Sequence, residues 1–151
     1  MSQKITPQAA QQLLQAIEQD ARLAQELKIL LQEEKSLLEQ RQYTAHQNLL
    51  NRKTQLLMAL DQADMARRQA MSDMGLGLDK QGFDLFVKQV PGTWQQRFQQ
   101  SWEQLSDTMN TCARLNKVNG KILSHAQHSM DRLMAIIKGA TNHASIYQAN
   151  G

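Results

Sequence analysis

The sequence predicts an all-α protein: an elongated, antiparallel, coiled-coil-like bundle of three long helices and one short helix, with a mobile C-terminal tail. Apolar residues recur at spacings of three and four over long stretches, which is the period of one face of a helix. Only two prolines interrupt the 151 residues, and alternating runs rich in Val, Ile and Thr, which are typical of strands, are absent. The length favours a single domain over residues 1–151.

Composition narrows the class of protein further. A single cysteine excludes an internal disulfide and fits the reducing cytoplasm, so we expect a cytoplasmic protein. The polar N-terminus shows no signal peptide, and no run approaches the roughly 18 apolar residues of a membrane span. The formal net charge is +3, and the basic excess lies in the second half of the chain.

The first helix is expected over residues 7–41. Thr6 is suited to be its N-cap, and Pro7 to occupy its first position. Five apolar residues recur every seven positions, as in a coiled coil: Ala10, Ile17, Ala24, Leu31 and Leu38. Asp20 and Glu34 interrupt this apolar face.

The second helix is expected over residues 44–74, capped by Thr44 after a tight turn. Leu49, Leu56, Ala63 and Ala70 continue a seven-residue repeat along it. One continuous or kinked helix through residues 41–44 is the alternative. Two helices joined by a short turn must be antiparallel neighbours.

A short helix and a long one complete the bundle. Asp79 can cap a helix over residues 80–90, and four residues share one of its faces: Phe83, Phe86, Val87 and Val90. Thr93 and Gln96 then match a capping box for a helix over residues 93–138, roughly 65–70 Å long. Gly139 is expected to end this helix, leaving residues 140–151 as the tail.

Two asparagines, Asn116 and Asn119, break the apolar face of the long helix. A single buried asparagine in such a face fixes helix register at a cost in stability. Two, with Gly120 beside them, suggest that the long helix leaves its partners near this point. Cys112, on the same face, is expected to pack as a small hydrophobic residue.

Beyond Gly120 the apolar residues cover a broad arc that the shorter helices cannot fully bury. Methionines on such a face suit adaptable binding of partner helices. The alternative is burial within the monomer or in a weak homodimer. The residues predicted to bind a partner are Ile122, Leu123, Met130, Leu133 and Ile137.

A basic stripe lies opposite this arc and consists of Arg114, Lys117, Lys121, His125, His128 and Arg132. It would suit an acidic partner or nucleic acid. No aromatic residues interleave with it, so we expect a solvated face and no nucleic-acid binding. Two histidines without a third ligand make a weak metal site. No catalytic, metal or cofactor motif is present, which argues against an enzyme.

Together these features resemble the FlgN family of flagellar export chaperones. The resemblance rests on the leucine-rich helices with Glu33-Glu34 and Lys53, on Trp102, on Asn116-x-x-Asn119-Gly120, and on the ending Tyr147-Gln-Ala-Asn-Gly151. The segment from Gly75 to Pro91 departs from the family pattern.

The resemblance implies a cytoplasmic protein without enzymatic activity that binds the C-terminal helices of the hook–filament junction proteins FlgK and FlgL. Such chaperones prevent premature assembly of these clients and deliver them to the export gate. The resemblance further implies that Tyr147 contacts the gate protein FlhA. The alternative is a structural coiled-coil tether or adaptor without client specificity.

Overall fold

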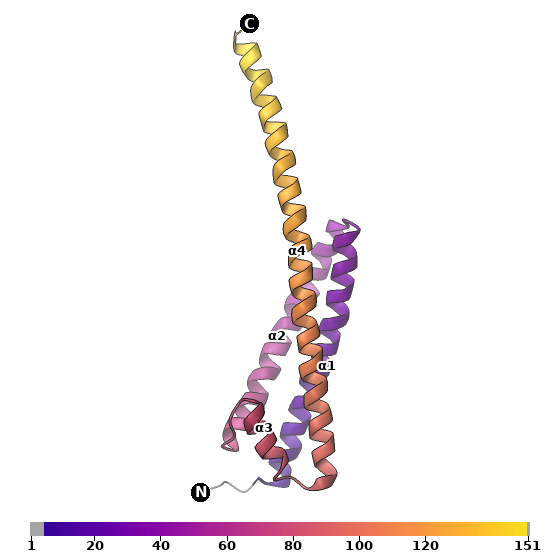
Figure 1. The fold of residues 1–151 in the computed structure, drawn as a ribbon, viewed down its shortest axis with the longest axis vertical. Helices are drawn as coiled ribbons and strands as arrows, with labels where there is room; N and C mark the ends of the chain where they lie inside the picture. The colour runs from indigo at the N-terminus through magenta and orange to yellow at the C-terminus, as the bar shows by residue number, and fades with distance from the viewer. Residues whose placement is uncertain (1–4, 151) are drawn as a thin grey trace.

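The computed structural model describes the backbone of residues 5–150 and the side chains of residues 5–139. Four helices follow one another: α1 (Pro7–Glu39), α2 (Tyr43–Asp73), α3 (Lys80–Val87) and α4 (Gly92–Asn150). No strand occurs in this part of the chain, and the predicted elongated helical bundle is confirmed (Figure 1). With 59 residues, α4 is about 88 Å long and extends far past the turn between α1 and α2 (Figure 1).

The central helix of the bundle is α1. It packs against α2 on one side and α4 on another, whereas no Cα atoms of α2 and α4 come within 8 Å of each other among the described residues. Cys112 Sγ lies 3.5 Å from the carbonyl oxygen of Ala24, and Asn119 Nδ2 lies 2.9 Å from that of Leu31. Both contacts join positions 88 apart, so α1 and α4 run in the same direction while α2 runs antiparallel to α1.

The predicted heptad row of α1 lies in the seam between α1 and α4. All five row residues on α1 are buried, and so are the counterparts of the first four on α4, which are Phe98, Leu105, Cys112 and Asn119. The counterpart of Leu38, Ala126, is partly buried. Burial of each large apolar side chain stabilises the fold by about 1.5–3 kcal/mol. Burial also raises the pKa of the Cys112 thiol, in keeping with the predicted role as a core residue.

Aromatic residues close the end of the bundle where α3 lies. Phe83 stacks on Trp102 with 4.2 Å between ring centroids, and Phe86 meets Phe98 edge-on at 4.9 Å. All four residues predicted on one face of this short helix are buried. The predicted end at residue 90 is wrong, however, because α3 ends at Val87 and Val90 follows it. The carboxylate of Asp79 accepts a hydrogen bond 2.9 Å long from the backbone N–H of Gly82, which confirms the predicted cap.

A charged pair occupies the first polar interruption of α1. Arg67 Nε donates to Asp20 Oδ2 at 2.8 Å, and the guanidinium carbon of Arg67 lies 5.4 Å from the ring centroid of Trp102. Burial raises the pKa of Asp20, and Arg67 offsets only part of that effect. Asp20 therefore links α1 to α2 rather than facing solvent.

The turn after α1 separates two distinct helices. Arg41 has a φ of 57°, a left-handed conformation that a continuous helix does not contain. The alternative of one helix through residues 41–44 is therefore wrong. The helix starts also differ slightly from prediction, since Thr44 and Thr93 lie one residue inside α2 and α4 instead of capping them.

The largest correction concerns the end of the long helix. The backbone of α4 stays helical to Asn150, whereas the sequence predicted an end at Gly139. Glycine destabilises a helix interior by roughly 1 kcal/mol but does not by itself reverse the chain, and no proline follows it here. The predicted mobility of the tail concerns residues 140–151, whose side chains lie outside the described part of the chain.

Candidate functional site

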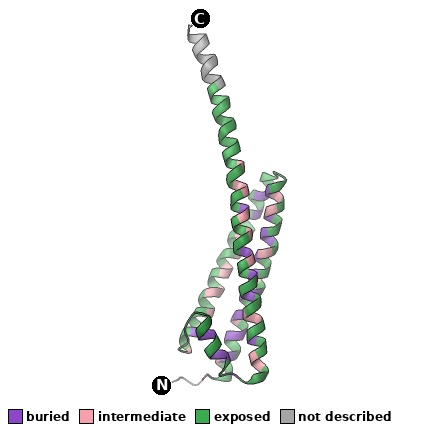
Figure 2. Ribbon diagram, in the orientation of Figure 1, coloured by how far each residue is buried: buried purple, intermediate pink, exposed green. Residues whose placement is uncertain are grey.

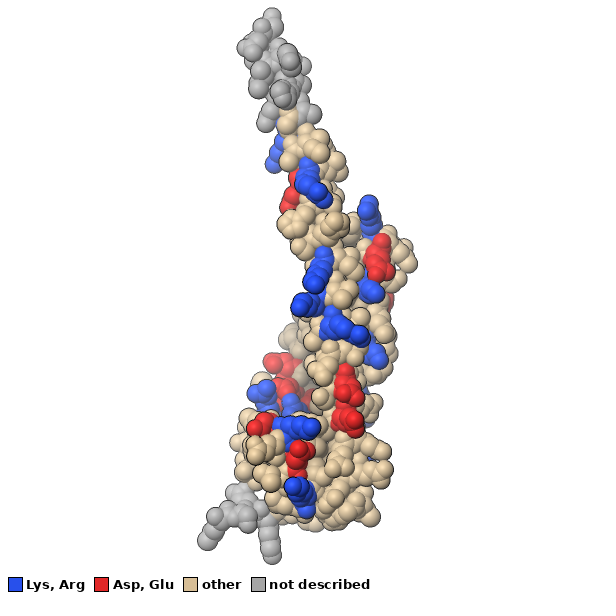
Figure 3. Space-filling view, in the orientation of Figure 1, with Lys and Arg blue, Asp and Glu red and all other residues tan. Residues whose placement is uncertain are grey.

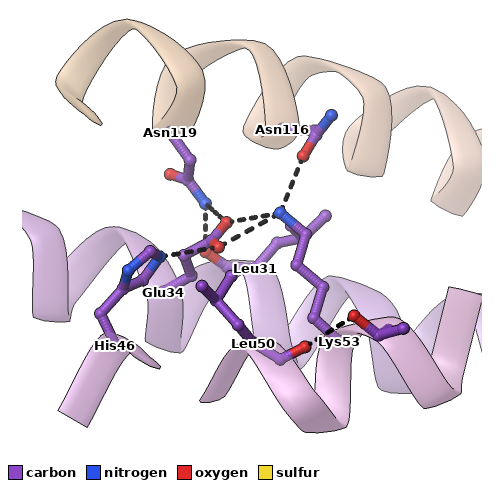
Figure 4. Close-up of polar contacts among 8 residues, drawn as sticks. Leu31, Glu34, His46, Leu50, Lys53, Asn116 and Asn119 are labelled. Carbon is purple, nitrogen blue, oxygen red and sulfur yellow. Dashed lines mark hydrogen bonds and ion pairs between the residues drawn. The ribbon is translucent and has the colours of Figure 1, made fainter. Parts of the chain in front are cut away.

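Three helices meet at one buried carboxylate, that of Glu34 in α1 (Figure 4). From α2, Lys53 Nζ lies 3.0 and 3.2 Å from its two oxygens, and His46 Nε2 lies 3.1 Å from Oε2. From α4, Asn119 Nδ2 donates to Oε1 at 2.9 Å. Lys53 also donates to Asn116 Oδ1 at 3.1 Å, so both asparagines take part.

This network keeps Glu34 charged despite its burial. Burial alone would raise its pKa, but the hydrogen bonds from Asn119 and Lys53, the charge of Lys53 and the contact with His46 together lower it below its ordinary value. A carboxylate satisfied from three sides can remain ionised in the interior. The polar break predicted at Asn116 and Asn119 is thus a specific junction between helices.

The bundle ends shortly after this junction. Asn119 is buried, Ile122, Leu123 and Ala126 are partly buried, and every residue from Gln127 to Gly139 is exposed. Figure 2 shows this change along α4, from mixed burial beside α1 to exposure above the turn. The expectation that the long helix leaves its partners near Gly120 is confirmed.

The exposed half of α4 carries apolar side chains. Met130 is 53% exposed, Leu133 51% and Ile137 49%. Of the five residues predicted to bind a partner, these three therefore lie on the surface, while Ile122 and Leu123 form the transition into the bundle.

A groove of about 360 Å³ lies where α4 separates from the turn. One wall comes from the turn and the helix ends that flank it, with Leu38, Glu39, Arg41 and Tyr43. The other comes from α4, with Ile122, His125, Ala126, Ser129, Met130 and Leu133. Three of the predicted residues thus share one concave surface with side chains from the turn.

Sequence reasoning missed the residues on the turn. Tyr43 is 40% exposed and was not among the residues predicted to bind a partner. Its position opposite α4 depends on how the helices align, which no local pattern reveals. The sequence gives only a weak indication of the contacts of Glu34. It shows an acidic residue in an apolar row of the first helix, and a lysine on the next helix that can lie beside it once the two helices pair.

The basic stripe is exposed along its whole length, as expected for a solvated face, but one of its members, His125, lines the groove instead of lying opposite it. Figure 3 shows Lys and Arg side chains spread along α4, with acidic side chains more frequent lower in the bundle. His125 and His128 belong to no group of three metal-ligating side chains, and no such group occurs among the described residues. No helix in this part of the chain is long and apolar enough to cross a bilayer.

The residue predicted to dock at the export gate, Tyr147, lies among residues whose side chains are outside the described part of the chain. Its backbone belongs to the last turns of α4. Its role therefore stays a prediction from the sequence.

Comparison with known proteins gave two matches. A sequence model of the family described as "FlgN protein" matches residues 1–151. The fold is similar to a crystal structure described as that of a flagella synthesis protein FlgN from Pseudomonas aeruginosa, with a TM-score of 0.68 and 26% sequence identity. That similarity covers 76% of this chain and 88% of the other. No curated protein matches.

Proposed function

The chain belongs to the FlgN family of flagellar export chaperones, and from this premise we propose that it acts in the cytoplasm on the hook–filament junction proteins FlgK and FlgL. It binds the C-terminal helices of these clients, prevents their premature assembly and delivers them to the export gate. It does so by binding alone, without catalysis.

The observation that supports client binding is the exposed apolar half of α4. Met130 and Leu133 are each about half exposed on a helix that has left its own bundle. Exposed apolar side chains do not stabilise a monomer, whereas an amphipathic client helix can bury its apolar face against them. Methionine adapts its shape to different partners, which suits a chaperone with two clients.

The rival function, a structural tether, is supported by the length of α4 but does not require this surface. A tether needs a rigid helix and defined ends. It does not require half-exposed leucine and methionine side chains next to a groove.

Substitution of Leu133 or Ile137 by Asp tests the proposal. A charge on this surface should abolish binding of purified FlgK and FlgL, because the apolar contact would have to bury an unpaired carboxylate. The melting temperature should stay within about 2 °C, since both side chains are half exposed. Unchanged client binding would favour the tether, and a large drop in melting temperature would show that these residues stabilise the protein instead.

A further inference from the structure

The seam between α1 and α4 has a fixed register, and the row of α4 positions that forms it continues past the end of α1. Its two polar contacts join positions 88 apart, so each row residue on α1 faces one on α4. The last such pair is Leu38 and Ala126, which both line the groove. The next position on α4, seven residues further, is Leu133.

Leu133 has no counterpart because α1 ends at Glu39. It is 51% exposed and lies on the wall of the groove with Met130. The row that is buried against α1 as far as Asn119, and partly buried at Ala126, therefore continues for at least one heptad as an exposed surface. A helix placed along it would extend an existing interface rather than create a new one.

We propose that the groove between the α1–α2 turn and α4 receives the end of one client helix, which lies along α4 beyond the turn as α1 does below it. Leu38 and Tyr43 form the second wall of this client site. The inference rests on the proposed function. It adds that the turn takes part in the client site, that the client helix follows the register of the α1–α4 seam, and that one client helix is bound.

The charges around the groove indicate what kind of helix it accepts. Arg41 and His125 line it together with one acidic residue, Glu39. On the exposed part of α4 beyond the groove, Arg132 and Lys138 outnumber the one acidic residue, Asp131. The matching partner is an amphipathic helix with acidic residues flanking its apolar face. A second copy of this chain would instead bring the same basic excess against it, which disfavours a homodimer here.

Tyr43 provides the test, because the predicted client residues do not include it. The probe is a synthetic peptide of the C-terminal helix of FlgK, titrated by fluorescence anisotropy. Tyr43→Asp should weaken its binding at least about tenfold, and so should Leu133→Asp. Met58→Asp is the matched control, since Met58 is an apolar residue of α2 that is 60% exposed and does not line the groove.

The outcomes separate this inference from the proposed function. Loss of binding in Leu133→Asp but not in Tyr43→Asp overturns the inference and leaves the chaperone function standing. A peptide that does not bind the unmodified protein argues against the proposed function itself. A photoreactive benzoylphenylalanine at position 43 should cross-link to the peptide, which covers the case in which Tyr43→Asp fails to fold.

Two further measurements test whether the groove binds an acidic client helix or a second copy of this chain. Replacing the acidic residues of the peptide by their amides should weaken binding several-fold, with the largest effect at low salt. Analytical ultracentrifugation should show a monomer in the absence of peptide. A dimer that Tyr43→Asp dissociates would overturn the inference, because the groove would then hold a second copy.

Discussion

The side-chain amide of Asn119 in α4 donates a hydrogen bond 2.9 Å long to the buried carboxylate of Glu34 in α1. The same amide reaches the carbonyl oxygen of Leu31, also at 2.9 Å. Within residues 5–139, these are the last side-chain hydrogen bonds between α4 and α1 before α4 becomes exposed. They therefore fix the position along α4 at which the proposed client surface begins.

Removal of the Glu34 carboxylate should be costly. Glu34→Ala leaves Lys53, His46 and Asn119 without their shared acceptor, and we expect the free energy of unfolding to fall by about 3 kcal/mol. Glu33→Ala is the matched control, because its ion pair with Arg52 has side chains 47% and 59% exposed and should contribute less than about 1 kcal/mol. Urea denaturation measures both, and equal effects would contradict a structural role for the network.

Acid should weaken the protein partly through the same carboxylate. The folded protein holds the pKa of Glu34 below its ordinary value of 4.5, so its contribution is complete above about pH 4.5 and is lost as the pH falls through the lower folded value. Asp20 acts in the opposite sense, because its raised pKa makes the folded state easier to protonate. Glu34→Gln should therefore show a flatter loss of stability than the unmodified protein as the pH falls below about 4.5. If the two proteins lose stability in parallel as the pH falls, groups other than Glu34 dominate the acid sensitivity.

Two glycines should respond to alanine in opposite ways. A Cβ at Gly82 would lie 2.1 Å from the carbonyl oxygen of Gly77, so Gly82→Ala must displace the backbone and loosen the packing of α3. A Cβ at Gly120 meets nothing within 4 Å, and Gly120→Ala should stabilise α4 by about 0.5–1 kcal/mol. Thermal melts followed by circular dichroism compare the two. A stabilising Gly82→Ala would contradict the close approach of the two backbone segments.

The basic stripe should matter little for client binding. Arg114, Lys117 and Lys121 are exposed, and their replacement by glutamine should change the affinity for FlgK or FlgL by no more than about threefold. Binding assays on this triple variant, beside Leu133→Asp, would separate the two faces of α4. Complete loss of binding in the triple variant would move the client site to the basic face.

Tyr147 is expected to serve a different partner. In the proposed function Tyr147→Ala leaves melting and client binding nearly unchanged but reduces docking to FlhA and secretion of the clients. A tyrosine supplies apolar area and a hydroxyl that can pair at an interface. Pull-down of the client and of FlhA with this one variant, together with a melting curve, tests the separation. Intact binding to FlhA would refute the assignment, and a drop of several degrees in melting would instead indicate that Tyr147 packs on the bundle.

Much of this protein could be predicted from local patterns. The heptad row from Ala10 to Leu38, the caps at Thr6 and Asp79 and the apolar face around Phe86 all occur as expected, because each depends on residues within one helix. The exposure of Leu133 was also predictable, since the long helix outlasts its neighbours. Membership of the FlgN family was visible in the same residues.

The tertiary structure decided what depends on alignment between helices. Sequence spacing marked Glu34 as a fault in an apolar row, but only the register between α1, α2 and α4 brings Lys53, His46 and Asn119 to its carboxylate. The same register places Tyr43 across the groove from Leu133. The end of α4 was missed for a related reason, because a glycine signals where a helix can stop, and only the surroundings determine whether it does.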